Sequence, residues 1–488
     1  MAVYRTPGVY VEEIQTIPPA VAAVATAIPC FFGYTQNATL AGQPTKIGSL
    51  LEFEEKFGGS PVQQIDLTIT KTVNPSGALL NVAVSLSAGS LADPVPVEMM
   101  HYAVKHYFAN GGGPCWIYSL GGHGANVQNA YTTAITALEA VDEPTLLVFP
   151  GATRLGGTGH EAVVQAALTS CLNTQDRFTI ADVRGSLAGG AHVTAQQIDA
   201  GFRTSIAPVD PKALQYGAAY WPYLQTRIPW NTNDDNIRIT VYAELVQTGN
   251  ATAPQNPDPA LVTAVGGGAV PISNAAVVNG ETAVYNAAKA FAQNQFVTLP
   301  PSAAIAGAYA TTDRNRGVWK APANIGMASV VSPALPANNT LNDALNVDPT
   351  SGKSVNVIRS FAGRGILVWG ARTLAGNDNE YRYVPVRRLT IMIEESIEKA
   401  IAAFVFESND ANTWVKVRTM IENFLLTQWR LGALQGQKPE DAFDVQVGLG
   451  VTMSADDILN GIMRVRVVIA PVRPAEFIVL TFEQKLPT

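Results

Sequence analysis

The sequence predicts a multi-domain protein in which an α/β region is followed by an α+β region, with a strand arm at each end of the chain. Three observations support this fold class. The chain has 488 residues, enough for roughly two to four domains. Helical and strand patterns alternate from residue 98 to about 183, and two amphipathic helices followed by short strands fill the last third. Hydrophobic residues make up 47% and charged residues 15%, a composition that favours folded cores over disorder.

The α/β region is predicted from three helix–strand pairs. The expected helices cover residues 97–109, 126–140 and 159–173, and the expected strands cover residues 115–120, 145–149 and 178–183. Two stretches interrupt this alternation. Residues 62–96 alternate apolar and polar side chains between Pro and Gly, which indicates a β-rich insertion. Residues 225–290 are rich in Asn, Gly, Ala and Pro around a strand at 237–243, and we interpret them as a second insertion on the outer surface.

The last third has the clearest helical periodicity. Residues 389–406 place apolar side chains on one helical face and charged ones largely on the other. A second helix is predicted over residues 413–430, and Gly432 stands where a C-terminal capping glycine is expected. Strands are predicted at residues 445–451, 465–469 and 476–482. Two helices packed on a small sheet would form the α+β domain.

Both ends of the chain are predicted to be arms that pair with another sheet. The N-terminal strand comprises Val9, Tyr10, Val11 and Glu12, and the C-terminal strand contains Phe477, Ile478, Val479 and Leu480. Pro471 and Pro474 precede the latter. Because two prolines fix φ and lack amide donors, this linker disfavours a tight hairpin and acts as a hinge. A strand held away from its own sheet needs another edge. On pattern alone, both strands could instead fold back onto their own domain.

Charge and cysteine content exclude several classes of function. The net charge is −7 and no Lys/Arg block is present, which disfavours direct binding of nucleic acid. The apolar run at residues 21–32 is too short to span a membrane and follows acidic residues, so no direct membrane contact is expected. Three cysteines, Cys30, Cys115 and Cys171, lie in apolar surroundings and suggest buried thiols in a reducing cytoplasm, where the protein would be assembled.

The enzymatic signals are weak, and we expect no catalytic, cofactor or metal site. Residues 351–354, which include Lys353, are similar to the end of a P-loop, but Val347 stands where that loop requires Gly. His160 and Glu161 begin like a zinc-protease helix, but Val164 replaces the second His. Cys115 has no evident base nearby and is interpreted as a core residue.

Nine segments resemble the tail-sheath family of contractile phages and phage-like contractile injection systems. In chain order they cover residues 6–13, 49–58, 107–116, 300–302 with 306–310, 313–324, 363–373, 386–389, 429–436 and 470–479. The segment at 313–324 reads Asp-Arg-Asn-Arg-Gly-Val-Trp-Lys-Ala-Pro-Ala-Asn. The matches extend over nearly the whole chain in the same order. Ser408 departs from the family's usual Pro, and neither insertion has a clear match.

The resemblance implies a structural subunit and no enzyme. Such subunits stack as rings into a helical homo-oligomer around an inner tube protein, in a metastable extended state that contracts to drive the tube through a target cell envelope. Terminal arms augment the sheets of neighbouring subunits, and baseplate and terminal cap proteins complete the particle. No nucleotide is hydrolysed. Alternatives are a static helical tube or shell and, more remotely, a P-loop enzyme.

We therefore expect four regions. Residues 1–25 would be the N-terminal arm, 26–359 an outer α/β domain carrying both insertions, 360–470 the inner sheath domain and 471–488 the C-terminal arm. Two charged surfaces of the inner domain are candidates for the tube contact. One is the short helix with Asp456 and Asp457, and the other is the polar face with Lys416 and Arg418. Because exposed ion pairs are weak, either would release readily during expansion; an ordinary solvated face is the alternative.

Overall fold

The computed structural model describes residues 20–124, 126–184, 194–254, 261 and 265–479. The chain divides into two compact units. Unit 1 combines the residues up to Val24 with Leu389–Arg473, and unit 2 combines Ala25–Arg388 with the residues from Pro474 onward. The chain therefore passes between the units at three places. The assignment of inner and outer sheath domains stays a prediction.

Unit 2 is built around an eight-stranded mixed sheet of the order β16-β15-β8-β7-β6-β1-β5-β2. Its strands are β1 (Pro29–Thr35), β2 (Pro44–Ile47), β5 (Cys115–Gly122), β6 (Leu146–Val148), β7 (Phe178–Asp182), β8 (Gly217–Trp221), β15 (Val355–Phe361) and β16 (Gly365–Trp369). The inner strands pair in parallel, and the edge strands β2 and β16 are antiparallel. The central strands are buried throughout, which is typical of a sheet covered by helices. The predicted α/β layer is confirmed.

Helices of unit 2 pack against this sheet. They are α1 (Leu50–Phe57), α2 (Met100–Ala109), α3 (Gln128–Leu138), α4 (Gly159–Thr174), α5 (Ala195–Ile198), α9 (Ser302–Arg316) and α10 (Asn339–Asn346), with shorter turns η1 (Pro150–Arg154), η2 (Asp199–Arg203) and η3 (Pro211–Tyr216). Helix α2 packs on α9, and α3 packs on α4. Gly307 permits the close approach of α2 and α9, because a Cβ there would lie 2.6 Å from the carbonyl oxygen of Tyr107.

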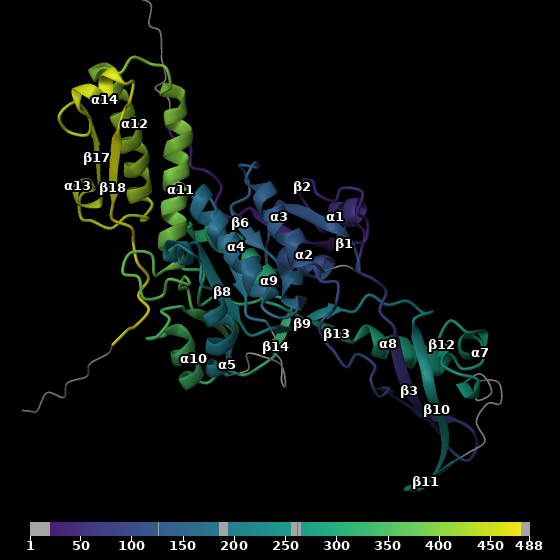
Figure 1. The fold of residues 1–488 in the computed structure, drawn as a ribbon. Helices are drawn as coiled ribbons and strands as arrows, with labels where there is room; N and C mark the ends of the chain where they lie inside the picture. The colour runs from purple at the N-terminus through teal and green to yellow at the C-terminus, as the bar shows by residue number, and fades with distance from the viewer. Residues whose placement is uncertain (1–19, 125, 185–193, 255–260, 262–264, 480–488) are drawn as a thin grey trace, which may run out of the picture. The chain divides into compact units, whose positions relative to one another are not determined.

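The two predicted insertions meet in a separate sheet. Its strands are β3 (Ile65–Val73), β4 (Leu79–Leu86), β10 (Ile237–Thr248), β11 (Ala251–Pro254) and β12 (Val270–Pro271). β3 pairs in parallel with β10, so that Ile65 lies opposite Ile237, and antiparallel with β4. Helices α7 (Ala275–Val278) and α8 (Thr282–Gln293) help to enclose a hydrophobic core there (Figure 1). The β structure predicted for both stretches is confirmed. A small sheet of β9 (Leu224–Pro229), β13 (Phe296–Leu299) and β14 (Val330–Pro333) follows.

Unit 1 contains the helices and strands predicted for the last third. It holds most of α11 (Val384–Ile401), the turn η4 (Ala402–Phe404), α12 (Ala411–Arg430), α13 (Pro439–Ala442), α14 (Ala455–Leu459), β17 (Phe443–Val447) and β18 (Val465–Ile469). β17 and β18 are antiparallel, and Figure 1 shows α12 running alongside them. Asp410 caps α12 by accepting from the amide of Thr413, and Gly432 follows its last turn with φ +86°, as predicted.

The predicted boundaries of two elements in the last third are wrong. The strand expected at 445–451 ends at Val447, because Gly448 (φ +158°) and Gly450 (φ +74°) turn the chain. The helix expected at 389–406 begins earlier, at Val384, because a proline in the first turn is compatible with a helix. Among the residues described beyond Val472, none forms a strand within the chain. Val9, Tyr10, Val11, Glu12 and Leu480 lie outside the described residues.

Candidate assembly site

The C-terminal segment presents apolar side chains to solvent. Phe477, Ile478 and Val479 are 70%, 79% and 87% exposed. A run of three large apolar residues at the surface loses the stabilisation of about 1.5–3 kcal/mol that burial gives each such side chain. Contiguous apolar exposure of this kind marks a surface that another molecule covers. The segment therefore has the composition of a strand without a strand partner in the described part of its own chain.

One acidic residue holds the start of this segment on unit 2. Glu476 Oε2 accepts hydrogen bonds from Arg372 Nη2 at 2.7 Å and from Tyr383 Oη at 3.0 Å. Its Oε1 accepts from Arg372 Nε at 2.9 Å and Asn346 Nδ2 at 2.6 Å. Burial alone would raise the pKa of Glu476, but the hydrogen bonds from Arg372 and Asn346 lower it overall. The carboxylate is therefore held in its charged form.

The two prolines predicted to form a hinge, Pro471 and Pro474, lie on either side of a passage of the chain between the units. Pro471 bridges to Leu434, and the flanking backbone is fixed because Gln435 N donates to Ala470 O at 2.8 Å. The amide of Val472 donates to the carbonyl of Ala433 at 3.1 Å. Pro471 thus belongs to the ordered part of unit 1, whereas Pro474 is the first residue of the returning stretch of unit 2.

The two-stranded sheet of unit 1 has open edges. In the described residues, β17 pairs with β18 alone. Alternate residues of β18 are exposed, and Val468 is 45% exposed. Two-stranded sheets are marginal in water, and unpaired edges accept further strands. These edges are therefore the described backbone surfaces of unit 1 best suited to accept an arm.

The four residues predicted to contact the tube differ in the hydrogen bonds and ion pairs that they already form within the subunit. Asp457 accepts from Ser454 N at 2.9 Å and Oγ at 2.8 Å in the capping box of α14, whose N-cap is Ser454, and it pairs with Arg464 Nη2 at 3.0 Å. Hydrogen bonds from Ser454 and then Arg464 lower the pKa of Asp457 to about 2. Arg418 Nε pairs with Glu422 at 2.7 Å on α12. Asp456 is exposed beside Asp457.

Lys416 lines a groove of unit 1. The groove has a volume of about 960 Å³ and follows α12 from Thr413 to Leu431. Its other wall is formed by Ala20, Val21 and Ala23 and by the turn after α11. The predicted polar face of α12 is thus partly a concave surface rather than a flat solvated one.

A second buried ion pair lies where two chain passages begin. Arg388 Nη2 donates to Asp313 Oδ2 at 2.6 Å and to the carbonyl of Thr26 at 2.8 Å. Thr26 Oγ1 also donates to Asp313 Oδ2 at 2.5 Å. The Asp313 and Arg388 side chains are only 8% and 2% exposed. The guanidinium lies 4.5 Å from the centroid of the Tyr309 ring. This cluster joins residues 26 and 388, each within two positions of a boundary between the units.

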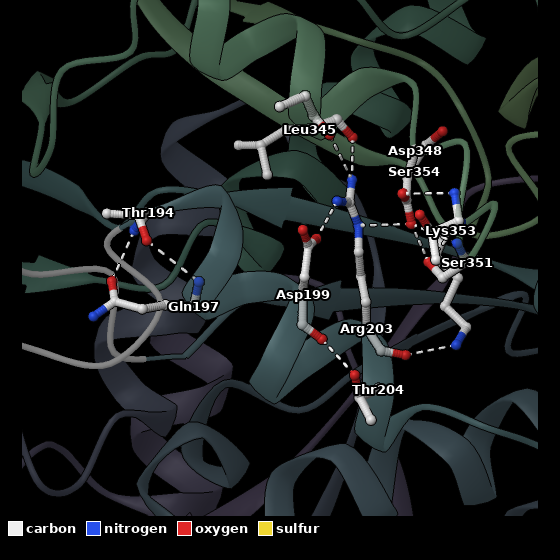
Figure 2. Close-up of polar contacts among 12 residues, drawn as sticks. Thr194, Gln197, Asp199, Arg203, Thr204, Leu345, Asp348, Ser351, Lys353 and Ser354 are labelled. Atoms are coloured by element: carbon white, nitrogen blue, oxygen red, sulfur yellow. Dashed lines mark hydrogen bonds and ion pairs between the residues drawn. The ribbon is translucent and has the colours of Figure 1, made fainter.

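The local structure around Lys353 differs from a P-loop. The loop precedes strand β15, whereas a P-loop precedes a helix. Figure 2 shows Lys353 directed at Arg203, whose carbonyl accepts from Lys353 Nζ at 2.5 Å. Ser351 Oγ donates to Asp348, and Arg203 Nη2 donates to the carbonyl of Leu345 at 2.7 Å. The loop side chains are therefore used in internal packing.

The other residues considered as possible nucleophiles or metal ligands are also buried or paired within the fold. Cys30, Cys115 and Cys171 are buried free thiols, as predicted, and burial raises the pKa of each. His160 Nε2 donates to the carbonyl of Asp182 at 2.7 Å, and Glu161 pairs with Arg184 at 2.9 Å. Within the described residues, no three His, Cys, Asp or Glu side chains gather in a way that could hold a metal ion. The same part of the chain contains no helix with the length and apolar character needed to cross a bilayer.

Comparisons with known proteins place this architecture among contractile sheath proteins. Residues 376–485 match the family model of the phage tail sheath C-terminal domain. The chain is 26% identical to a contracted sheath of the extracellular contractile injection system PVC, covering 99% of each chain with a TM-score of 0.64. It is 29% identical to the contracted helical sheath of the anti-feeding prophage, covering 99% of this chain and 100% of that one with a TM-score of 0.61. A chain in the baseplate structure of the same prophage is 30% identical, with 99% and 100% coverage and a TM-score of 0.60. No curated protein matches the chain.

A mixed α/β body that matches contractile sheath structures over 99% of its length identifies the chain as a structural subunit of a contractile sheath. The chain belongs to the tail-sheath family of contractile phage tails and phage-like contractile injection systems.

Sequence reasoning did not single out the anchoring role of Glu476 or the pairing of Asp313 with Arg388. The available signal was an acidic residue directly before an apolar strand, which we interpreted only as part of that strand.

Proposed function

We propose that this sheath subunit polymerises around an inner tube by exchanging terminal strands with neighbouring copies. The observation that carries the proposal is the exposure of Phe477, Ile478 and Val479 next to an anchored Glu476. The open edges of β17 and β18 support it from the receiving side, because each additional backbone hydrogen bond would contribute about 0.5–1.5 kcal/mol. Such contacts join the end of one copy to the sheet of another, and repeated they give rings or open helices.

The same proposal covers the remaining components of the machine. The subunit would assemble in the cytoplasm of a bacterial cell, store energy in an extended state and contract without hydrolysing nucleotide. The similarity to a chain in a baseplate structure supports contact between the first sheath subunits and a baseplate. For the tube, Asp456 and Lys416 are favoured over Asp457, because Asp457 is already engaged by Ser454 and Arg464.

Truncation of the two arms tests strand exchange. Removing residues 1–17, or all residues after Glu476, should leave a folded and soluble protein that forms no tubes by electron microscopy. The reason is that both deletions remove backbone available for pairing while leaving the described cores intact. Removing only residues 483–488 is the matched control, since the predicted strand is retained, and it should still give tubes. Long sheaths formed by either arm deletion would contradict the proposal.

The hinge is tested in the same assay. Replacing both Pro471 and Pro474 by Ala should alter tube yield or geometry more than it alters the melting temperature of the subunit. The substitution relaxes the linker without removing a buried side chain, because both prolines are at least partly exposed. Equal and small effects on assembly and melting would count against a hinge at these positions.

A further inference from the structure

We propose that Glu476 is a positioning residue that fixes the point at which the C-terminal arm leaves its subunit. This inference rests on the proposed strand exchange. Exposure to solvent changes abruptly along this segment. The Glu476 side chain is 19% exposed, whereas the next three residues, all apolar, are 70–87% exposed as whole residues. A terminal strand that completes its own core would show the opposite order, with apolar residues inside and the carboxylate outside.

The receiving site is held by unit 2 independently of the arm. The backbone of Arg372 exchanges two hydrogen bonds with the side chain of Asn356, each 2.8 Å long, and Asn356 is fully buried in β15. Arg372 also forms a β-bridge with Tyr383. The donors of the site therefore come from a rigid framework, which lowers the entropic cost of holding the carboxylate.

The carboxylate is saturated by this site. Its Oε1 accepts two hydrogen bonds and its Oε2 accepts three, and the donors come from Asn346 at the end of α10, from Arg372 after β16 and from Tyr383 before α11. Arg372 presents its guanidinium edge to both oxygens, which fixes direction as well as distance. Ile478 would share the side of Glu476 in a continuous strand but is 79% exposed, so the chain leaves the surface directly after the anchor.

The anchor sets the reach of the arm. From Glu476 to Phe482 an extended chain covers about 20 Å, so the arm can pair only with an edge within that distance. Without the anchor, the tether would begin near Pro471 and gain about five residues, or roughly 16 Å. A longer and looser tether lowers the effective concentration of the strand at any one edge. The partner that this geometry selects is a second copy of the chain at a fixed distance.

Two readouts on the full-length protein test the inference. Glu476→Gln keeps the size of the side chain but removes its charge and turns an amide toward Arg372. In a Val479→Cys background, a spin label attaches selectively at position 479, because the three native cysteines are buried. The Gln variant should increase the mobility of this label in the unassembled subunit. Without the label background, it should raise the critical concentration for tube formation about tenfold or more, as expected for the loss of charged hydrogen bonds.

Glu143→Gln is the matched control. It breaks the exposed pair with Lys46 on the same unit, where the side chains are 40% and 46% exposed, and should leave both readouts within about twofold of wild type. Tyr383→Phe removes one of the five hydrogen bonds to the Glu476 carboxylate and should shift both readouts in the same direction by a smaller factor. If Glu476→Gln does not fold by circular dichroism, Tyr383→Phe decides the outcome.

The inference is overturned if the deciding variant, Glu476→Gln when it folds and Tyr383→Phe otherwise, matches the Glu143→Gln control in either readout. Failure of the proposed function is recognised separately. If the truncation after Glu476 assembles normally, then strand exchange itself is absent. If that truncation abolishes tubes while Glu476→Gln behaves as wild type, then strand exchange stands and only the anchoring role of Glu476 is lost.

Discussion

Replacing Asp313 by Asn should weaken the fold of unit 2 where the chain passes between the two units. Asn has nearly the same shape as Asp, so the substitution leaves no cavity and changes mainly the charge. Its amide group would bring N–H donors toward the Arg388 guanidinium, which offers only donors itself. Arg388 would then remain buried, with a side-chain exposure of 2%, and without its carboxylate partner.

The expected loss in the free energy of unfolding follows from the burial of Arg388. Removing one partner of a buried ion pair costs about 3–5 kcal/mol, because the other charge is left uncompensated. Two contacts of Arg388 survive, with the carbonyl of Thr26 at 2.8 Å and with the Tyr309 ring at 4.5 Å. The cation–π contact retains about 0.5–2 kcal/mol. We therefore expect a loss near the lower end of the range, about 3 kcal/mol in the free energy of unfolding.

Urea unfolding followed by far-ultraviolet circular dichroism measures this loss. Asp93→Asn is the matched control, since it makes the same chemical change in the exposed pair with Arg154, where the Asp side chain is 53% exposed. The control should lose less than about 1 kcal/mol. If Asp313→Asn destabilises the protein no more than Asp93→Asn does, the reasoning that this pair holds the chain passages together is refuted.

Two further predictions concern titration and the tube surface. Burial raises the pKa of Asp182 to about 7, against hydrogen bonds from Ser302 that lower it, so the folded state keeps a proton that the unfolded state loses near pH 4. The free energy of unfolding should therefore fall as pH rises from about 4 to 7, by up to about 1.4 kcal/mol per pH unit. Asp182→Asn should flatten this slope. Identical pH profiles of unfolding for the wild type and the variant would exclude the assignment of the raised pKa to Asp182. Lys416→Glu, which reverses a charge on the groove of unit 1, should reduce co-sedimentation with the purified tube protein at low salt. Unchanged co-sedimentation would remove this groove from the candidate tube contacts.

Local patterns were sufficient to predict the main helices. The helix predicted at residues 413–430 is α12, and Gly432 follows it in the left-handed conformation, because amphipathic periodicity and capping depend on neighbours in sequence. The start of α11 was missed because the amphipathic periodicity is clear only from Leu389 onward, whereas the helix already begins at Val384 with a proline in its first turn. The end of β17 was missed because the alternation of apolar residues continues through Leu449 and Val451, which lie in a turn after Gly448.

Long-range pairing was beyond the reach of these patterns. Nothing in the alternation of residues 65–73 shows that their parallel partner begins at Ile237. The carboxylate of Asp182 accepts from Ser302, 120 positions later, and that of Glu476 accepts from Arg372, 104 positions earlier. Single polar residues carry no periodic signal, so their partners appear only when the fold brings distant elements together. The function was predictable from the sequence through the family resemblance, whereas the contacts of Asp182 and Glu476 with distant residues were not.

The sheet shared by the two insertions restricts how residues 62–96 and 225–290 can change during evolution or engineering. β3 lies between β4 and β10, and β10 comes from a stretch about 170 positions further along the chain. Deleting residues 62–96 alone would expose the long edge of β10 and the apolar side of α8, and deleting the later stretch alone would leave a bare hairpin. A viable replacement must substitute both stretches at once, so the module is best treated as one transplantable unit encoded in two pieces.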